Sequence, residues 1–220
     1  MLNTVRQWLF GTPVPAGWAP VRVWSEEQGG RLKPTHGRDG FAVELDLASA
    51  PARLEWGPSQ RRYLGPGELR LRADTGLEPQ LYALVMPRSL LQALEHDIFN
   101  QYTDSVKTRL DEETPEEMRW LAMSPKLSAQ QLGALAQDYA AVSNVAAWVA
   151  DWLGGPLGPA LLACAEAGSA GPNWPLALIV QRGRLVLRAA MPTPDHLAIA
   201  RYFDLFSLAL TAARRLPRVN

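Results

Sequence analysis

Apolar and polar residues alternate strictly in three short segments of the N-terminal third of the chain. In residues 41–47 the odd-numbered positions are apolar, and Glu44 and Asp46 lie between them. The same alternation recurs in residues 52–57 and 68–74. A period of two places alternate side chains on opposite faces of a sheet, so each segment is predicted to be a strand buried on one face.

One further strand is predicted before these three and one after them. Residues 21–25 read as a short strand, and residues 80–86 are more continuously apolar, as in a central strand that is covered on both faces. Glycines and prolines interrupt residues 26–40, which are predicted to be a turn-rich connection. Residues 20–86 are therefore predicted to form a mainly antiparallel sheet of four or five strands.

The middle of the chain changes to helical spacing. After Met86-Pro87, apolar residues recur every three or four positions up to Tyr102. Helices are also predicted where capping or spacing signals occur, with starts at Thr114, Ser128 and Ser143 and a last short helix after Pro156.

The last third returns to strands and ends in a helix. Residues 175–181 and 184–190 flank Arg182-Gly183, which predicts a β-hairpin. Asp195 is a candidate cap for a long amphipathic helix, in which Ile199, Phe203, Phe206 and Leu210 form the buried stripe.

These elements predict an α+β fold with an antiparallel sheet of five to seven strands and amphipathic helices packed on one side of it. A strand, Met-Pro and a helix occur twice, at residues 81–99 and 185–206, which suggests two β-β-α units related by pseudo-symmetry; chance recurrence is the alternative. The predicted parts of the single core are a sheet and helix in residues 1–110, a helical insertion in 111–167, and a completing hairpin and helix in 168–220.

Composition restricts the class of protein. The 220 residues include 22 basic and 22 acidic side chains, so no overall field favours nucleic acid as a partner. A single cysteine, Cys164, allows no intrachain disulfide, which fits a reducing compartment. The longest uncharged stretch, residues 152–165, is shorter than the roughly 20 residues of a membrane span and is broken by glycine and proline. A cytoplasmic bacterial protein without a membrane span is the prediction.

The loop between Gly57-Pro58 and Gly65-Pro66 is a candidate anion site. It presents two guanidiniums, a phenol and a hydroxyl, from Arg61, Arg62, Tyr63 and Ser59. Arginine binds phosphate and carboxylate groups bidentately, so the loop could hold such a group. A plain connection is the alternative. Nearby, Arg70 and Arg72 alternate with Leu69 and Leu71. Ion pairs with residues on a neighbouring strand explain these outward arginines without any ligand.

Tryptophan is frequent, with eight residues. Trp148 and Trp152 lie one helical turn apart, and Trp120 precedes them in the same segment; these three are candidates for a partner-binding face, because tryptophan is enriched at binding hot spots. Packing in the core is the alternative.

Catalytic and metal-binding patterns are absent from the sequence. His36, His96 and His196 have no neighbouring ligands at metal-site spacing, and no nucleophile motif occurs. No cofactor, metal or catalytic residue is predicted, although whether the protein is an enzyme stays open. The leading hypothesis is a non-catalytic accessory protein with a protein partner. The alternative is a small-molecule or anion binder, or an enzyme, with an arginine-lined pocket.

Overall fold

The structure is a computed structural model that describes residues 14–37, 39–47, 50–104, 115–166 and 175–217. These residues form one eight-stranded antiparallel sheet in the order β1-β2-β3-β4-β8-β7-β5-β6. The strands are β1 (Arg31–Pro34), β2 (Phe41–Leu47), β3 (Ala50–Pro58), β4 (Gly67–Asp74), β5 (Ala83–Pro87), β6 (Tyr139–Ser143), β7 (Leu176–Gln181) and β8 (Arg184–Ala190).

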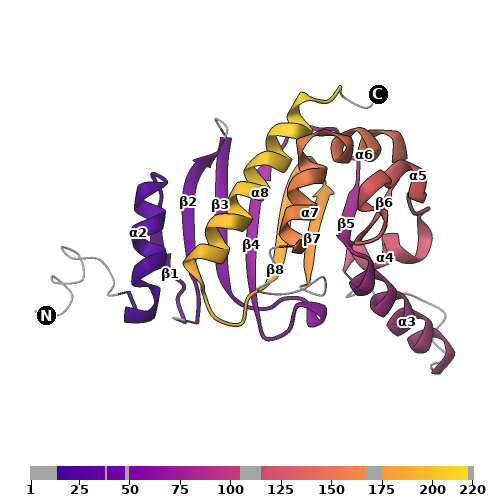
Figure 1. Cartoon of the computed structure of the whole chain (residues 1–220). Helices are drawn as coiled ribbons and strands as arrows, with labels where there is room; N and C mark the ends of the chain where they lie inside the picture. Colours follow the sequence, from indigo (N-terminus) through magenta and orange to yellow (C-terminus); the bar gives the residue numbers. More distant parts are fainter. Residues whose placement is uncertain (1–13, 38, 48–49, 105–114, 167–174, 218–220) are drawn as a thin grey trace, which may run out of the picture.

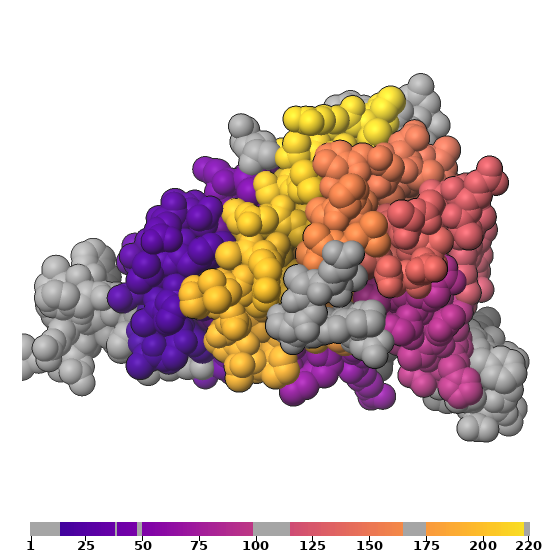
Figure 2. All heavy atoms as spheres, in the orientation of Figure 1, coloured from indigo at the N-terminus to yellow at the C-terminus, as the bar shows by residue number. Residues whose placement is uncertain are grey.

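Helices pack against one sheet face, which we call the covered face. Figure 1 shows α8 and α7 in front of the strands and α2 beside β1 at one edge of the sheet, and the space-filling view shows α8 between α2 and α7 (Figure 2). Apolar side chains from β2 to β8 join these helices in one large core. The helices on this face are α2 (Ala19–Glu27), α6 (Ala146–Trp152), α7 (Gly158–Glu166) and α8 (His196–Arg215).

The second face carries a smaller apolar cluster at one end of the sheet. There α3 (Arg88–Asp104) and α4 (Glu116–Met123) pack on β5, β6 and β7. Leu91 and Leu94 of α3 and Leu121 of α4 meet Leu84 and Met86 of β5. Apolar residues on both faces explain why β5 has no exposed position, as predicted for a central strand.

Shorter elements connect these layers. Ser128 caps α5 with a complete capping box, in which the Gln131 side chain accepts from the backbone of Ser128. Gly155 has non-helical backbone angles and kinks the chain between α6 and α7. The short elements are η1 (Ala16–Trp18), η2 (Arg62–Leu64), α5 (Ala129–Leu132), η3 (Gly133–Ala136) and η4 (Leu153–Leu157).

The inward-facing positions inferred from alternation are confirmed. Phe41 lies opposite Trp56, which lies opposite Leu69, and Val43, Leu54 and Leu71 form the next row. All six contribute to the core of the covered face. The hairpin at Arg182-Gly183 is confirmed as well, and both residues have the positive φ of a tight type I′ turn.

Residues 21–25 are a correction, because they belong to α2 and not to a strand. Val21 and Ser25, four positions apart, are buried, whereas Val23 is half exposed. That burial has helical spacing, and Pro20 stands in the first turn, where proline is tolerated. The first strand of the sheet is β1, which lies within the segment predicted to be a turn-rich connection.

The middle segment is a second correction, because it is not only helical. The helix predicted from Ser128 to Tyr139 ends early, and residues 139–143 form β6, which pairs with β5. With β1 and β6, the sheet has eight strands rather than five to seven. All five positions of β6 are buried, so the alternation that identifies a half-buried strand is missing.

The pseudo-repeat is not confirmed. The helix after Met86-Pro87 is α3 and the helix after Met191-Pro192 is α8, and they pack on opposite faces of the sheet. The expected packing of the helices on one side is therefore wrong. The division at residues 110 and 167 stays a prediction, and both boundaries fall outside the described residues.

Candidate binding surface

The second face of the sheet has two halves that differ in chemistry. Its apolar half, on β5, β6 and β7, lies under α3 and α4. The other half, on β1 to β4 and β8, carries charged side chains, and we call it the charged half. The halves meet at β8, where Val186 joins the apolar cluster while Arg184 and Arg188 point to the charged half. Among the described residues, no helix packs on the charged half through an apolar cluster.

Cross-strand register arranges these charges in rows. Glu44 of β2 lies opposite Arg53 of β3, which lies opposite Arg72 of β4. In the next row, Glu55 lies opposite Arg70, which lies opposite Arg188 of β8. Directly opposed side chains on an antiparallel pair are close enough to interact, so each row is an electrostatic unit.

Glu55 links the two rows. Its carboxylate accepts from Arg53 at 2.8 Å and from Arg70 Nε at 3.0 Å. Burial would raise the pKa of Glu55, but Arg70 and Arg53 outweigh burial and hold the pKa below its ordinary value. Glu55 is therefore ionised over the whole neutral range.

Glu68 closes one end of the charged half and is buried, with 2% of its surface exposed. Its two carboxylate oxygens accept from Ser59 Oγ and Gln60 N at 3.0 Å each, from Arg188 Nη1 at 2.6 Å and from Arg70 Nη1 at 3.3 Å. A buried carboxylate is tolerated when its lone pairs are occupied, so this network is structural.

Glu117 of α4 is equally buried and holds the loop that was the candidate anion site. Arg61 donates to both of its oxygens, and Tyr63 Oη donates to it at 3.2 Å. Burial and the nearby Glu117 carboxylate raise the pKa of Tyr63, so it is a neutral donor at neutral pH. Arg61, Tyr63 and Ser59 thus already bind carboxylates of this chain, while Arg62 is exposed. Anion binding by this loop stays a prediction, and an anion at Arg61 would have to displace Glu117.

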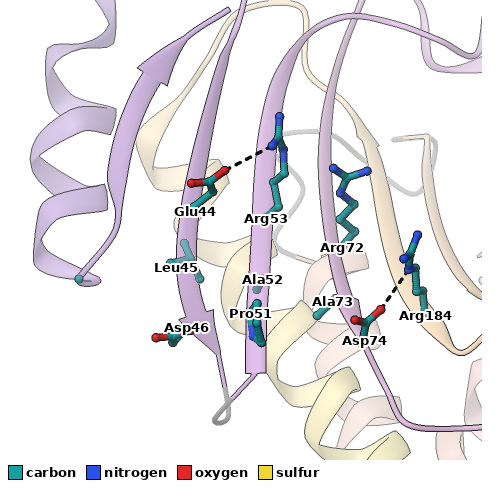
Figure 3. A pocket seen from close by; sticks show the side chains of 11 residues that line it. Glu44, Leu45, Asp46, Pro51, Ala52, Arg53, Arg72, Ala73, Asp74 and Arg184 are labelled. Atoms are coloured by element: carbon teal, nitrogen blue, oxygen red, sulfur yellow. Dashed lines mark hydrogen bonds and ion pairs between the residues drawn. The ribbon is translucent and has the colours of Figure 1, made fainter. Parts of the chain in front are cut away.

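A shallow pocket of about 620 Å³ lies on the charged half, where β2 ends and β3 begins. Three guanidiniums and three carboxylates line it, so its formal charge is zero: Arg53, Arg72, Arg184, Glu44, Asp46 and Asp74. Figure 3 shows Arg53 and Arg72 on neighbouring strands with their guanidiniums directed the same way. Arg53 pairs with Glu44 and Arg184 pairs with Asp74, whereas Arg72 makes no hydrogen bond or ion pair with any described residue.

The three candidate tryptophans do not share a surface. Trp148 and Trp152 are 5% and 1% exposed, and Trp152 Nε1 donates to the carbonyl oxygen of Ala209 at 3.0 Å. Trp120 lies on the other side of the sheet, where its ring stacks on Tyr82 with centroids 4.7 Å apart. Core packing accounts for the first two residues. The predicted partner-binding role of the three stays a prediction that these positions do not favour.

Other chemistry is sparse in the part of the chain that the structure describes. There, no group of three His, Cys, Asp or Glu side chains is placed to hold a metal ion. Cys164 is half-buried, and burial raises the pKa of its thiol. A search of the described helices finds none with the length and apolarity required to cross a membrane.

No family model and no curated protein matches this chain. Among solved structures, the crystal structure of the mycobacterial trehalose monomycolate transport factor A, TtfA, is similar. It aligns with a TM-score of 0.51 at 8% identity, over 93% of this chain and 97% of that chain. At this identity the likeness concerns the fold alone.

Sequence reasoning placed the outward arginines of β4 on one face but missed the pocket. The missing information is the register, because only the pairing of β3 with β4 places Arg53 opposite Arg72. The alternation Glu-Leu-Arg-Leu-Arg-Ala-Asp was the available signal, and it could not distinguish paired from unpaired arginines.

Proposed function

We propose that this protein is a non-catalytic accessory protein that binds a protein partner through the charged half of its sheet. The observation that carries this proposal is the exposure of that surface. The covered face and the apolar half are packed under helices, whereas the Asp74 and Glu44 side chains are 73% and 57% exposed.

The balance of charge supports a protein as the partner. The pocket carries equal numbers of guanidiniums and carboxylates, so it attracts neither a polyanion nor a polycation at long range. Mixed charges give an interface its orientation and exclude wrong partners through like-charge contacts. A protein surface with the complementary pattern of acidic and basic side chains meets this requirement.

An accessory role also agrees with the fold comparison. TtfA is named as a transport factor, so a similar fold occurs in a protein with that description. The comparison supplies no substrate and no partner for this chain. A cytoplasmic location remains part of the proposal.

Site-specific photo-cross-linking tests the proposal. A cross-linking amino acid is placed at Arg31 or Asp46, on the charged half, and in control variants at Val23 of α2 or Leu197 of α8, which are exposed on the helical side. We expect one and the same protein to be captured from both positions on the charged half and from neither control. The purified partner should then bind the purified chain and give the same cross-links. Equal capture from all four positions, or capture from the controls alone, would contradict the proposal.

The second candidate is a small-anion binder, because three arginines line the pocket. It predicts that a small anion raises the melting temperature of the isolated protein and that Arg72→Gln removes this increase. If a millimolar small anion stabilises the parent protein in this way and the cross-linking positions capture no protein, this second function replaces the first.

A further inference from the structure

We propose that Arg72, with Arg53 beside it, binds a single carboxylate, supplied by an acidic side chain of the protein partner. This inference rests on the proposed function, because it names the group that the partner presents to the charged half.

The first step is the position of the two arginines. Arg53 and Arg72 are directly opposed on β3 and β4, where Cβ atoms lie about 4.5–5.5 Å apart and like charges repel. Glu44 and Glu55 compensate Arg53 through ion pairs of 3.4 and 2.8 Å. Arg72 interacts electrostatically with Glu55 but forms no ion pair with a described residue. An anion placed between the two guanidiniums would relieve the repulsion.

The second step compares Arg72 with the other arginines on this surface. Arg70 binds Glu55 and Glu68, Arg188 binds Glu68, and Arg184 binds Asp74. Each of these guanidiniums already has a carboxylate. Arg72 has the same planar fork of donors and the same outward position, but within the described ranges it has no acceptor. A carboxylate, which its neighbours bind, also matches the donors of Arg72.

The third step selects a single carboxylate over a more highly charged anion. Glu44, Asp46 and Asp74 balance the three guanidiniums of the pocket, so a phosphate dianion or a nucleic-acid backbone would leave the pocket with an excess of at least two negative charges. One carboxylate carries one charge and accepts two parallel hydrogen bonds from a guanidinium. The balanced charge of the pocket therefore favours a single carboxylate over a more highly charged anion.

The fourth step concerns access. Arg72 is exposed, and the pocket of about 620 Å³ opens on a surface that no described helix covers. An incoming side chain needs no rearrangement of the sheet. Because an exposed ion pair adds little affinity, this contact mainly sets the orientation of the partner.

Nuclear magnetic resonance of the arginine Nε–Hε groups gives a direct test. The probes are two blocked peptides, acetyl-Gly-Glu-Gly-amide and acetyl-Gly-Gln-Gly-amide, which differ by one carboxylate, and inorganic phosphate at the same ionic strength. We expect the Glu peptide to shift the Arg72 signal saturably, and the Gln peptide to leave it unchanged. Arg72→Gln should also remove the accompanying shift at Arg53, whereas Arg22→Gln, on α2, should not. Equal shifts with both peptides, no shift with either, or a larger shift with phosphate would overturn the inference.

The cross-linking assay separates this inference from the proposed function. In the Asp46 cross-linking variant, Arg72→Gln should lower the yield of the partner adduct about twofold to fivefold, the loss of no more than about 1 kcal/mol of binding free energy. Arg22→Gln should leave the yield unchanged. If the adduct forms at full yield with Arg72→Gln, the inference fails while the proposed function stands. If the Glu peptide binds at Arg72 but the charged half captures no protein, the proposed function fails, and with it the partner as the source of the carboxylate.

Discussion

The two halves of the second sheet face belong to one sheet but lie mainly on different strands, and they differ in the residues that alternate with the core residues. On β5 and β7 the residues that point away from the covered face are apolar, among them Leu84, Met86 and Ile179, and helices α3 and α4 bury them. On β2, β3 and β4 the equivalent residues are charged, as with Glu44, Arg53 and Arg72.

The comparison shows that helices cover this sheet face where its outward-facing residues are apolar and leave it open where those residues are charged. The boundary falls within β8, where Val186 is buried under the apolar cluster while its neighbour Arg184, two residues away, is exposed. Glu68 and Glu117 lie along this boundary, and the loop at Arg61 ties α4 to the charged half. The two halves are thus joined by buried ion pairs.

The largest expected effect is in the apolar half. Leu84→Ala removes a fully buried side chain from the cluster under α3 and α4. We expect the free energy of unfolding to fall by about 3–5 kcal/mol, because the removed methyl groups leave a cavity. Denaturant unfolding measures it, and Val23→Ala, at a half-exposed position, is the control with little change. A loss below about 1 kcal/mol would mean that the helices do not bury this half.

The next effect tests the boundary. Glu117→Gln keeps the shape of the side chain but leaves the half-buried Arg61 guanidinium without its carboxylate. We expect a loss of about 2–3 kcal/mol in the free energy of unfolding. The matched control is the preceding residue, since Glu116 pairs with an exposed Arg182 and Glu116→Gln should cost no more than about 0.5 kcal/mol. Similar losses in both variants would show that the boundary pair has no special role.

A smaller effect depends on pH and concerns Glu55. Because its pKa in the folded protein lies below the ordinary 4.5, its ion pairs stabilise the fold above about pH 4.5. This stabilisation is lost as pH falls through the lowered pKa. Glu55→Gln should therefore cost about 1–2 kcal/mol at neutral pH and progressively less in acid.

Urea unfolding at several pH values measures the Glu55 effect. In an Arg70→Gln background the pH dependence of the difference should shrink, because Arg70 supplies the main attraction. A difference between parent and Glu55→Gln that grows in acid would contradict the assigned direction of the shift.

The smallest expected effect is at Arg72, which forms no ion pair with a described residue. Arg72→Gln should change the free energy of unfolding by less than about 0.5 kcal/mol, because an exposed side chain without an ion pair contributes little. Arg70→Gln, two residues earlier on the same strand face, should cost about 1–2 kcal/mol because it removes a partner of the buried Glu68. Thermal unfolding of both variants makes the comparison. Equal losses would mean that Arg72 has a stabilising partner after all.

Alternation was sufficient to predict the strands that are buried on one face. β2, β3 and β4 and the hairpin of β7 and β8 lie where their patterns placed them, and Asp195 caps α8 as expected. Alternation failed to identify elements in which buried and exposed residues do not alternate. β6 is buried at every position, and residues 21–25 contain too few turns of apolar spacing to separate a helix from a strand.

The site was less predictable than the fold. The sequence identifies outward arginines on β4, but partner choice depends on contacts between distant segments, such as Arg61 with Glu117 and Arg188 with Glu68. For the same reason the tryptophans of α6 could be read as surface residues, when packing against α8 buries them. The pairing of strands and the packing of distant segments therefore determine which charged side chains form ion pairs.

The strand order has a consequence for how the chain is made. β8 and β7 lie between β4 and β5, so two strands made after β5 separate strands that are neighbours in sequence. Until they emerge, β4 keeps an unpaired backbone edge, which is a template for pairing with another chain. Pairing of strands that are distant in sequence is also slow, because a long loop must close first. We therefore expect nascent chains that stop before residue 184 to aggregate or to recruit chaperones, and release from them to require the C-terminal hairpin.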